Sequence, residues 1–273
     1  MLLTNTISAL LVLSSAVTFV TSKKKVDYCS KDICPKRDHV RCGNDGSFGP
    51  KCPKKAQVIT ITDELKRLIL KTHNDLRKDI SAGNYKGLES AKRMIELEWN
   101  DELAENALYN AKTCVYAHDN CRNTKIYKNV GQNIAMYMTR AVGPINYKSV
   151  VNGILASWLR QAKNINMKLI EQFRSDSGGK VNNFAQMIRA SCSQIGCAIV
   201  HFSSNGKKSV FFVCNYSSAN IPKEPIYEVG PACSACATGC SFTSPGLCNT
   251  EEEKHLLKLK LKLLGLVKLK LKL

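Results

Sequence analysis

Apolar residues recur at helical spacing in a stretch that begins near Thr62. Asp63 and Glu64 stand at its start, where acidic side chains suit the positive amino end of a helix. The apolar positions share one face and are Leu65, Leu68, Ile69, Leu76 and Ile80. Gly83 is a natural stop, because glycine favours the backbone conformation in which helices end. The pattern predicts one amphipathic helix between Thr62 and Gly83.

Two further amphipathic helices are predicted. The second begins after Asn100, a good N-cap, with Asp101 and Glu102 in its first turn. Its inward positions are Leu103, Ala104, Ala107, Leu108 and Ala111. The third covers roughly residues 149–164, and its buried side carries Val151, Ile154, Leu155, Trp158, Leu159 and Ala162.

Shorter apolar runs predict strands. Residues 184–188 alternate as in a half-buried strand, and residues 198–202 and 209–216 are strand-like. Asn205-Gly206 between the last two runs is a hairpin-turn signal, in a connection that we expect to exceed two residues. Gly143-Pro144 indicates a loop over residues 136–148, and two prolines indicate a linker over residues 221–230.

The length of 273 residues favours one large domain with appendages. Residues 1–22 carry no charge, and residues 7–20 are mostly apolar or small. With Val20 and Ser22 before a plausible cleavage point, this segment reads as a secretory signal peptide, which makes the protein extracellular. The alternative is a retained anchor, although the apolar run is short for a membrane span.

All 13 cysteines lie between Cys29 and Cys248. After a signal peptide, this density indicates an oxidising compartment and a disulfide framework. A zinc knuckle at Cys233 and Cys236 is the competing interpretation, but it needs a second ligand pair, and the only histidine that follows is His255.

The net charge of +18 is uneven along the chain. Residues 254–273 contain seven lysines and no acidic residue, which leaves +11 (18 − 7) for the rest. Such a surplus favours weak contact with anionic membranes or heparan-type glycans, or serves only as a soluble surface. No phosphate loop or basic-aromatic motif points to nucleic acid.

The same basic tail carries ten leucines. Its alternation at residues 257–263 and 268–273 predicts an amphipathic strand or hairpin if the tail orders. A membrane-active segment is the functional interpretation. A disordered appendage or an artefact of gene prediction is the alternative.

Several motifs carry a family resemblance. Residues 182–189 (Asn-Asn-Phe-Ala-Gln-Met-Ile-Arg) and Ile195-Gly196-Cys197 resemble the pattern Gly-His-Tyr/Phe-Thr-Gln-Met-Val-Trp and Ile/Val-Gly-Cys of the secreted CAP superfamily (cysteine-rich secretory proteins, antigen 5, pathogenesis-related 1). His73-Asn74-Asp75-Leu76-Arg77 matches its His-Asn-x-x-Arg, and Gly131-Gln132-Asn133-Ile134 is the insect form of Gly-Glu-Asn-Leu/Ile. The cysteine-rich segment from Tyr28 resembles the amino-terminal arm of insect antigen 5 (venom allergen 5) proteins, and the resemblance extends to Cys248.

The resemblance implies an α+β fold, an α-β-α sandwich with a central antiparallel sheet and disulfide-stapled arms. Its domain organisation would be a signal peptide (1–22), a cysteine-rich arm (23–58), a CAP domain (59–220), a linker with a small cysteine-rich tail (221–250) and the Lys/Leu-rich tail (251–273).

The resemblance also implies a disulfide pairing. The antigen 5 pattern gives Cys29–Cys42, Cys34–Cys121, Cys52–Cys114 and Cys197–Cys214, and we add Cys233–Cys240 and Cys236–Cys248 for the tail. Cys192 is left over, either as a buried inert thiol or as a partner in an intermolecular disulfide.

Many CAP proteins place two histidines and two acidic residues around a cleft that can bind zinc. The matching positions here are His118, Gln132, Gln161 and Asn183, one imidazole and three amides. We therefore expect no tight metal site, no cofactor and no catalytic residue, because no acid at these positions orients His118.

What remains is recognition. The resemblance implies binding of a lipid, a sterol or a host protein by a venom- or saliva-type allergen-like protein, with residues 136–148 and 221–250 as candidate surfaces. A metal-dependent or serine-type hydrolase and a membrane-active effector are the alternatives. No Arg-Gly-Asp motif supports integrin binding. Asn215-Tyr216-Ser217 is a candidate glycan acceptor on a predicted strand.

Overall fold

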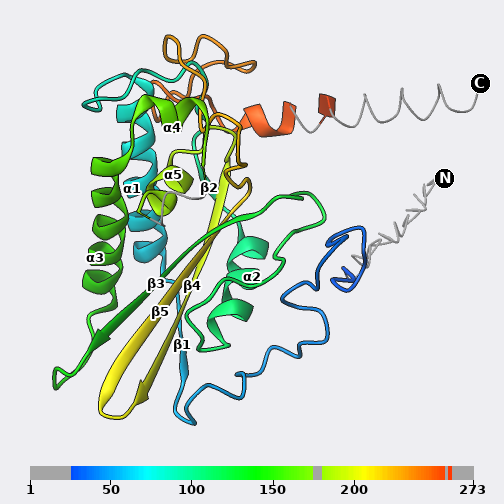
Figure 1. Ribbon diagram of the computed structural model, residues 1–273, viewed down its shortest axis with the longest axis vertical. Coiled ribbons are helices and arrows are strands. Elements are labelled where there is room, and N and C mark those ends of the chain that lie inside the picture. Colours follow the sequence, from blue (N-terminus) through cyan, green and yellow to red (C-terminus); the bar gives the residue numbers. More distant parts are fainter. Residues whose placement is uncertain (1–25, 175–179, 256–257, 260–273) are drawn as a thin grey trace, which may run out of the picture.

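A central sheet lies between two helical layers in the computed structural model, which describes residues 26–174, 180–255 and 258–259 (Figure 1). The elements in chain order are β1 (Gln57–Ile59), α1 (Asp63–Ser81), β2 (Glu98–Trp99), α2 (Asp101–Ala111), β3 (Gly131–Thr139), α3 (Tyr147–Leu159), the 3₁₀ helix η1 (Arg160–Asn164), α4 (Met167–Glu171), α5 (Asn182–Met187), β4 (Gln194–Ser204) and β5 (Lys207–Tyr216). The strand order is β1-β4-β5-β3, all antiparallel, and β2 pairs with β4 in parallel. The α-β-α sandwich expected from the resemblance is confirmed.

Strand β5 contributes to hydrophobic cores on both faces of the sheet. Val210 and Phe212 pack with α1, α3 and α5, while Phe211 and Val213 belong to a second cluster under α2. Successive side chains of a strand point to opposite faces, so this run of apolar residues reflects two covered faces. Gly196 allows the close approach of α2, because a Cβ atom there would lie 2.2 Å from the backbone nitrogen of Ala104.

The predicted helix starts are confirmed by their caps. Thr62 Oγ1 accepts a hydrogen bond from the Leu65 amide at 3.3 Å, and Asn100 Oδ1 accepts one from the Leu103 amide at 2.9 Å. The third helix starts earlier than predicted, at Tyr147 behind an Asn146 cap, and its predicted last turn is the 3₁₀ helix η1.

Three local predictions are wrong. Residues 184–187 belong to α5 rather than to a strand, and since all four side chains are buried, their alternation does not mark a half-buried face. Residues 136–139 lie in β3, paired with β5, rather than in a loop. The hairpin connection has only two residues, Asn205 at φ 51° and Gly206 at φ 71°, because both strands extend further than their apolar runs. Positive φ at both positions matches a type I′ turn.

Arg77 of α1 is fully buried and joins the helix to two loops. Its guanidinium donates to the carbonyl of Ile95 at 2.7 and 3.0 Å and to the carbonyl of Cys192 at 2.9 Å. It also donates to the carbonyls of Met187, Arg189 and Ala190 at 2.9–3.4 Å. The loops before β2 and between α5 and β4 are therefore fixed on α1 by one side chain.

The neighbouring motif residues are structural as well. Asn74 exchanges two hydrogen bonds with the backbone of Leu97, at 2.9 and 3.0 Å. His73 is fully buried, with Nδ1 against the Ile69 carbonyl at 2.7 Å and Nε2 against the Tyr216 hydroxyl at 2.9 Å. The structural interpretation of the helical histidine agrees with these contacts, which also tie α1 to the end of β5.

Six disulfides staple the chain. They join the four pairs that the resemblance implies and the two that we added for the tail: Cys29–Cys42, Cys34–Cys121, Cys52–Cys114, Cys197–Cys214, Cys233–Cys240 and Cys236–Cys248. One of them joins β4 to β5, and two fasten the amino-terminal arm to the segment after α2.

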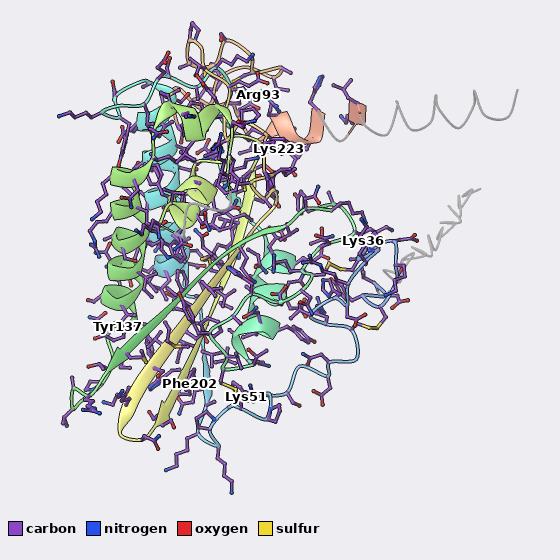
Figure 2. The ribbon with its side chains drawn as sticks, in the orientation of Figure 1. Lys36, Lys51, Arg93, Tyr137, Phe202 and Lys223 are labelled. Carbon is purple, nitrogen blue, oxygen red and sulfur yellow. A yellow bond between two sulfur atoms is a disulfide. The ribbon has the colours of Figure 1, made fainter. Side chains whose placement is uncertain are left out.

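The segment after β5 packs on the domain. Ile226 and Tyr227, in the segment expected to be a linker, are buried in the main core. Glu252 is also buried, and its carboxylate accepts hydrogen bonds from Arg93 Nε at 2.8 Å and from the Thr238 amide at 3.0 Å (Figure 2 labels Arg93). Ordered contacts thus reach beyond residue 250, whereas the alternating parts of the Lys/Leu-rich tail lie almost wholly outside the described residues. Within the described ranges, no helix is long and apolar enough to cross a membrane.

Replacing Arg77 with methionine tests its role as an internal brace. Arg77→Met should lower the free energy of unfolding by about 3–5 kcal/mol, because several buried carbonyls lose their donor at once. The matched control is Arg67→Met on an exposed position of the same helix. Chemical denaturation of the purified proteins measures both, and equal stability of Arg77→Met and wild type would contradict the assignment.

The stability should also fall in acid because of His73. Burial lowers the pKa of His73 to about 4, whereas an unfolded chain titrates near 6.5. The unfolded state therefore binds more protons as pH falls from about 6.5 to about 4, and the free energy of unfolding should drop by roughly 3 kcal/mol over that window. We expect His73→Gln to have a shallower pH dependence there than wild type or the exposed control His118→Gln; an unchanged slope would count against this.

Candidate functional site

The four residues that match the family's site come from four different segments. His118 lies in the loop after α2, Gln132 on β3, Gln161 in η1 and Asn183 at the start of α5. The structure joins them in two pairs, His118 with Gln132 and Gln161 with Asn183.

Gln132 is held from three sides. His118 Nδ1 lies 2.6 Å from Gln132 Oε1, so this ring nitrogen carries the hydrogen and donates. Gln132 Nε2 donates to Asp119 Oδ2 at 2.8 Å and to Asn215 Oδ1 at 3.0 Å. Both polar ends of this amide are used inside the protein, and His118 itself is exposed.

Asp119 is a site residue that the sequence analysis missed. Its carboxylate accepts from Arg122 Nε at 2.8 Å, from Asn110 Nδ2 at 2.9 Å and from Gln132. The side chain is only 7% exposed, and Arg122 neutralises its charge. The sequence held one signal for Asp119: it directly follows His118 and stands three residues before an arginine, a spacing at which opposite charges can pair. Asp119 reaches His118 only through the Gln132 amide, which does not take up a proton as a carboxylate would.

Gln161 serves as a cap. Its Oε1 accepts hydrogen bonds from the amides of Asn183 at 2.9 Å and Phe184 at 3.2 Å, at the beginning of α5. The Asn183 carbonyl accepts from Asn133 Nδ2 at 3.0 Å, and the same amide group donates to the Tyr216 hydroxyl at 3.1 Å. These contacts hold η1, α5 and β3 together and extend to the buried His73.

The donor set does not fit zinc. Zinc prefers imidazole, thiolate and carboxylate ligands, and the positions offer one imidazole and three amides. The oxygens of Gln132 and Gln161 already accept hydrogen bonds. Over the ranges that the structure describes, no group of three or more His, Cys, Asp or Glu side chains is placed to hold an ion. The absence of a tight metal site stays a prediction.

Among the described residues, no histidine ring hydrogen-bonds to a serine or threonine hydroxyl. In the described part of the chain, the hydroxyls that hydrogen-bond to a histidine ring are those of Tyr216, with His73, and of Tyr147, with His201 at 3.0 Å. His118 contacts an amide instead. General-base catalysis at a serine or threonine needs the base within reach of the hydroxyl, directly or through one water, and among the described residues no serine or threonine hydroxyl hydrogen-bonds to His118.

Two other predicted sites are buried. Asn215 is fully buried, with Nδ2 donating to the Leu103 carbonyl at 3.1 Å and Oδ1 accepting from Gln132, so a glycan there would require this region to open. Cys192 is the free cysteine and is also fully buried, as expected for an inert thiol, with Sγ 3.4 Å from the Gln194 carbonyl. An intermolecular disulfide would require this region to open.

Comparisons with known proteins point to one family. The model of the cysteine-rich secretory protein family, CAP, matches residues 70–216. Venom allergen-1 of Aedes aegypti is 34% identical over 230 residues, covering 83% of this chain and 89% of that protein. Antigen 5 like allergen Cul n 1 of Culicoides nubeculosus is 32% identical over 208 residues, covering 72% and 92%. The crystal structure of NaASP2 with Zn²⁺ has the same fold, at a TM-score of 0.58 and 22% identity, covering 72% of this chain and 99% of that one.

Metal titration tests the amide-rich site. Wild-type protein should bind zinc and copper at neutral pH with a dissociation constant weaker than about 1 μM, because amides are poor ligands for these ions. The triple variant Gln132→Glu/Gln161→Glu/Asn183→His supplies the missing ligand types and should bind zinc at least about tenfold more tightly. Submicromolar binding by wild type that disappears in His118→Ala would contradict the assignment; calorimetry measures all three proteins.

Proposed function

The chain belongs to the cysteine-rich secretory protein (CAP) family, and we propose that it is a secreted antigen 5-like protein that acts by binding a lipid or a host protein, not by catalysis. The observation that carries this proposal is that the site residues form hydrogen bonds with other parts of the protein. Gln132 bridges His118 and Asp119, and Gln161 caps α5. In other members of the fold, side chains at these positions could bind a metal or a substrate. In this protein they support its own backbone and loops.

Secretion is supported by covalent chemistry. Six disulfides pair twelve of the 13 cysteines, which requires an oxidising compartment. The uncharged segment 1–22 supplies a signal peptide in this proposal. The similarity to venom and saliva-type allergens of insects points to the same compartment.

Exposed apolar side chains support a binding role. Met138 and Val142, at the end of β3 and in the loop after it, are 60% and 101% exposed, and Phe242 in the cysteine-rich tail is 101% exposed. Figure 2 places Tyr137 and Phe202 at the same end of the sheet as this loop. Disulfides fix the tail, so Phe242 binds with little cost of ordering. Apolar groups in loops of a rigid scaffold suit a lipid or the apolar patch of a partner protein.

The basic surface supports weak contact with anionic membranes or glycans. Residues 131–170 contain five Lys or Arg residues and no acidic residue. Lys148 in this stretch is paired with Glu64, whereas Arg140 stands near Lys207 at the end of the β3–β5 pair. Such a surface attracts polyanions through long-range electrostatics that salt weakens. A membrane-active role for the Lys/Leu-rich tail has no contact among the described residues that favours it.

A hydrolysis assay separates binding from catalysis. Purified secreted protein should cleave casein and short-chain esters no faster than His118→Ala or the exposed control Lys125→Ala, because His118 contacts no nucleophile. A rate that His118→Ala abolishes and Lys125→Ala leaves unchanged would overturn the proposal.

The proposed binding of a lipid or a host protein needs a separate measurement. Organic extraction of the secreted protein, followed by mass spectrometry of the extract, should yield a retained lipid. If the extract is empty, the expected target is a protein, to be captured from host plasma on immobilised protein. Failure of both captures, with cleavage detected, would contradict the binding function.

A further inference from the structure

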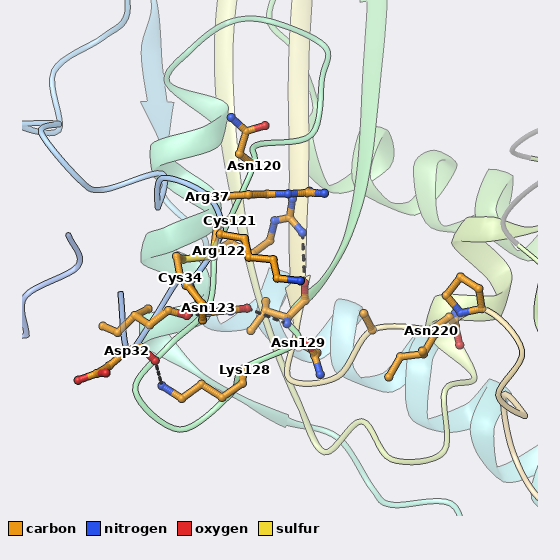
Figure 3. Close-up of a pocket in the computed structure, with 17 residues that line it drawn as sticks. Asp32, Cys34, Arg37, Asn120, Cys121, Arg122, Asn123, Lys128, Asn129 and Asn220 are labelled. Carbon is orange, nitrogen blue, oxygen red and sulfur yellow. Dashed lines mark hydrogen bonds between the residues drawn. A yellow bond between two sulfur atoms is a disulfide. The ribbon is translucent and has the colours of Figure 1, made fainter. Parts of the chain in front are cut away.

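The structure contains an open cavity of about 650 Å³ that none of the four site residues lines. Its walls come from three segments that are distant in sequence: residues 32–37 of the amino-terminal arm, residues 120–130 after α2, and residues 219–222 after β5. Figure 3 shows Arg37 and Arg122 on the side of the Cys34–Cys121 disulfide, with Asn220 across the cavity. We call this cavity the arm pocket.

The walls of the arm pocket are held in place by bonds of several kinds. The Cys34–Cys121 disulfide joins two of the segments. Asn123 Nδ2 donates to the Ile33 carbonyl at 3.0 Å, and His39 Nε2 donates to the Asn123 carbonyl at 2.8 Å. The Ala219 amide donates to the Asn129 carbonyl at 2.8 Å, which joins the third segment to the second. A pocket fixed in this way loses little conformational entropy when it binds a ligand.

The charge of the pocket lining is positive and mostly uncompensated. Lys36, Arg37 and Lys128 line it, and none of them pairs with a carboxylate among the described residues. Arg122 is neutralised by Asp119 and does not add to this charge. Asp32 is the one acidic residue of the lining; Lys128 Nζ donates to its backbone carbonyl at 2.9 Å, while its carboxylate points outward in Figure 3. Such a surplus favours an anion.

The floor of the pocket is apolar. Ile33 and Val130 are buried beneath it, and Pro35, Ile221 and Pro222 complete the apolar lining beside the disulfide. A simple inorganic anion would leave this surface in contact with water. An apolar chain would cover it and gain hydrophobic free energy in proportion to the area removed from water.

We propose that the arm pocket binds an amphiphilic organic anion, with its acidic group at Lys36 and Arg37 and its apolar chain on Ile33, Val130 and Ile221. The proposal rests on the binding function proposed above and assigns it a site and a ligand chemistry. The volume lies in the range of roughly 300–1,000 Å³ typical of small-molecule sites. The same combination of charge and apolar chain exists in free carboxylates and in anionic bilayers; the recessed floor favours the free molecule.

Titration with decanoate, well below its micelle concentration, tests the site in the full secreted protein. Decanoate should bind at low salt, whereas 1-decanol, with the same chain and no charge, should bind at least about tenfold more weakly, because charge-assisted hydrogen bonds are lost. Lys36→Gln/Arg37→Gln should weaken decanoate binding about tenfold for the same reason. Lys54→Gln/Lys55→Gln, an exposed pair in the same arm that does not line the pocket, removes the same charge and should stay within about twofold of wild type.

Four results would overturn the assignment: no decanoate binding, equal binding of decanol, equal weakening by both double variants, or binding only to phosphatidylserine vesicles and not to free decanoate. Each of these leaves the general binding function standing if a lipid or host protein is still captured. Hydrolysis that depends on His118 would overturn the proposed function instead, without changing the decanoate result, so the two failures are distinguishable.

Discussion

Arg77 is a fully buried cation whose partners are backbone carbonyls of two loops, and it fixes both loops on α1. The loop between α5 and β4 connects the helix that carries Asn183 to the central strand of the sheet. Burial lowers the pKa of Arg77 to about 10, which shows what holding this charge away from water costs. The cost is offset because one planar group satisfies carbonyls that would otherwise be buried without donors. Together with His73 and Asn74 on the same helix, Arg77 makes α1 the helix to which the loop between α5 and β4 and the loop before β2 are attached.

On this frame, the residues that match the family's site form part of the scaffold. Gln132 closes a hydrogen-bonded chain from His118 to Asp119 and Arg122, and Gln161 caps α5. An amide suits position 132 because Gln132 accepts from His118 and donates to Asp119 at once, which a carboxylate cannot do. The oxygens of Gln132 and Gln161 are therefore already used, and Arg122 neutralises Asp119. The proposed binding function accordingly rests on the rest of the surface, where the disulfide-fixed arm and tail present basic and apolar groups.

Much of the fold could be predicted from the sequence, where a local signal and a tertiary contact agree. Thr62 and Asn100 are caps by residue type and by position, and Asn205-Gly206 permits the positive φ angles that a tight turn needs. Residues 184–187 were predicted as a half-buried strand from their alternation. All four side chains are buried in α5, so the alternation does not identify a buried and an exposed face. Strand β3 was not predicted at all: Gly143-Pro144 extended the expected loop back to residue 136, whereas Tyr137 and Met138 are exposed but pair with β5. Only part of the hydrogen-bond network around His118 could be predicted. The resemblance located Gln132, but the contact of Asp119 with it arises from packing between a loop and a strand, which spacing along the chain does not reveal.

The central claim is that this protein has the CAP fold while the residues at the positions of the family's site serve internal structure. Native mass spectrometry of the protein secreted from insect cells tests that claim most directly, since it weighs the folded chain with whatever it carries. The account predicts a mass lower than that of the reduced chain by the hydrogens of six disulfides, one thiol that alkylates only after unfolding, and no metal ion. A stoichiometric zinc or copper ion that survives desalting and is lost in His118→Ala would contradict it.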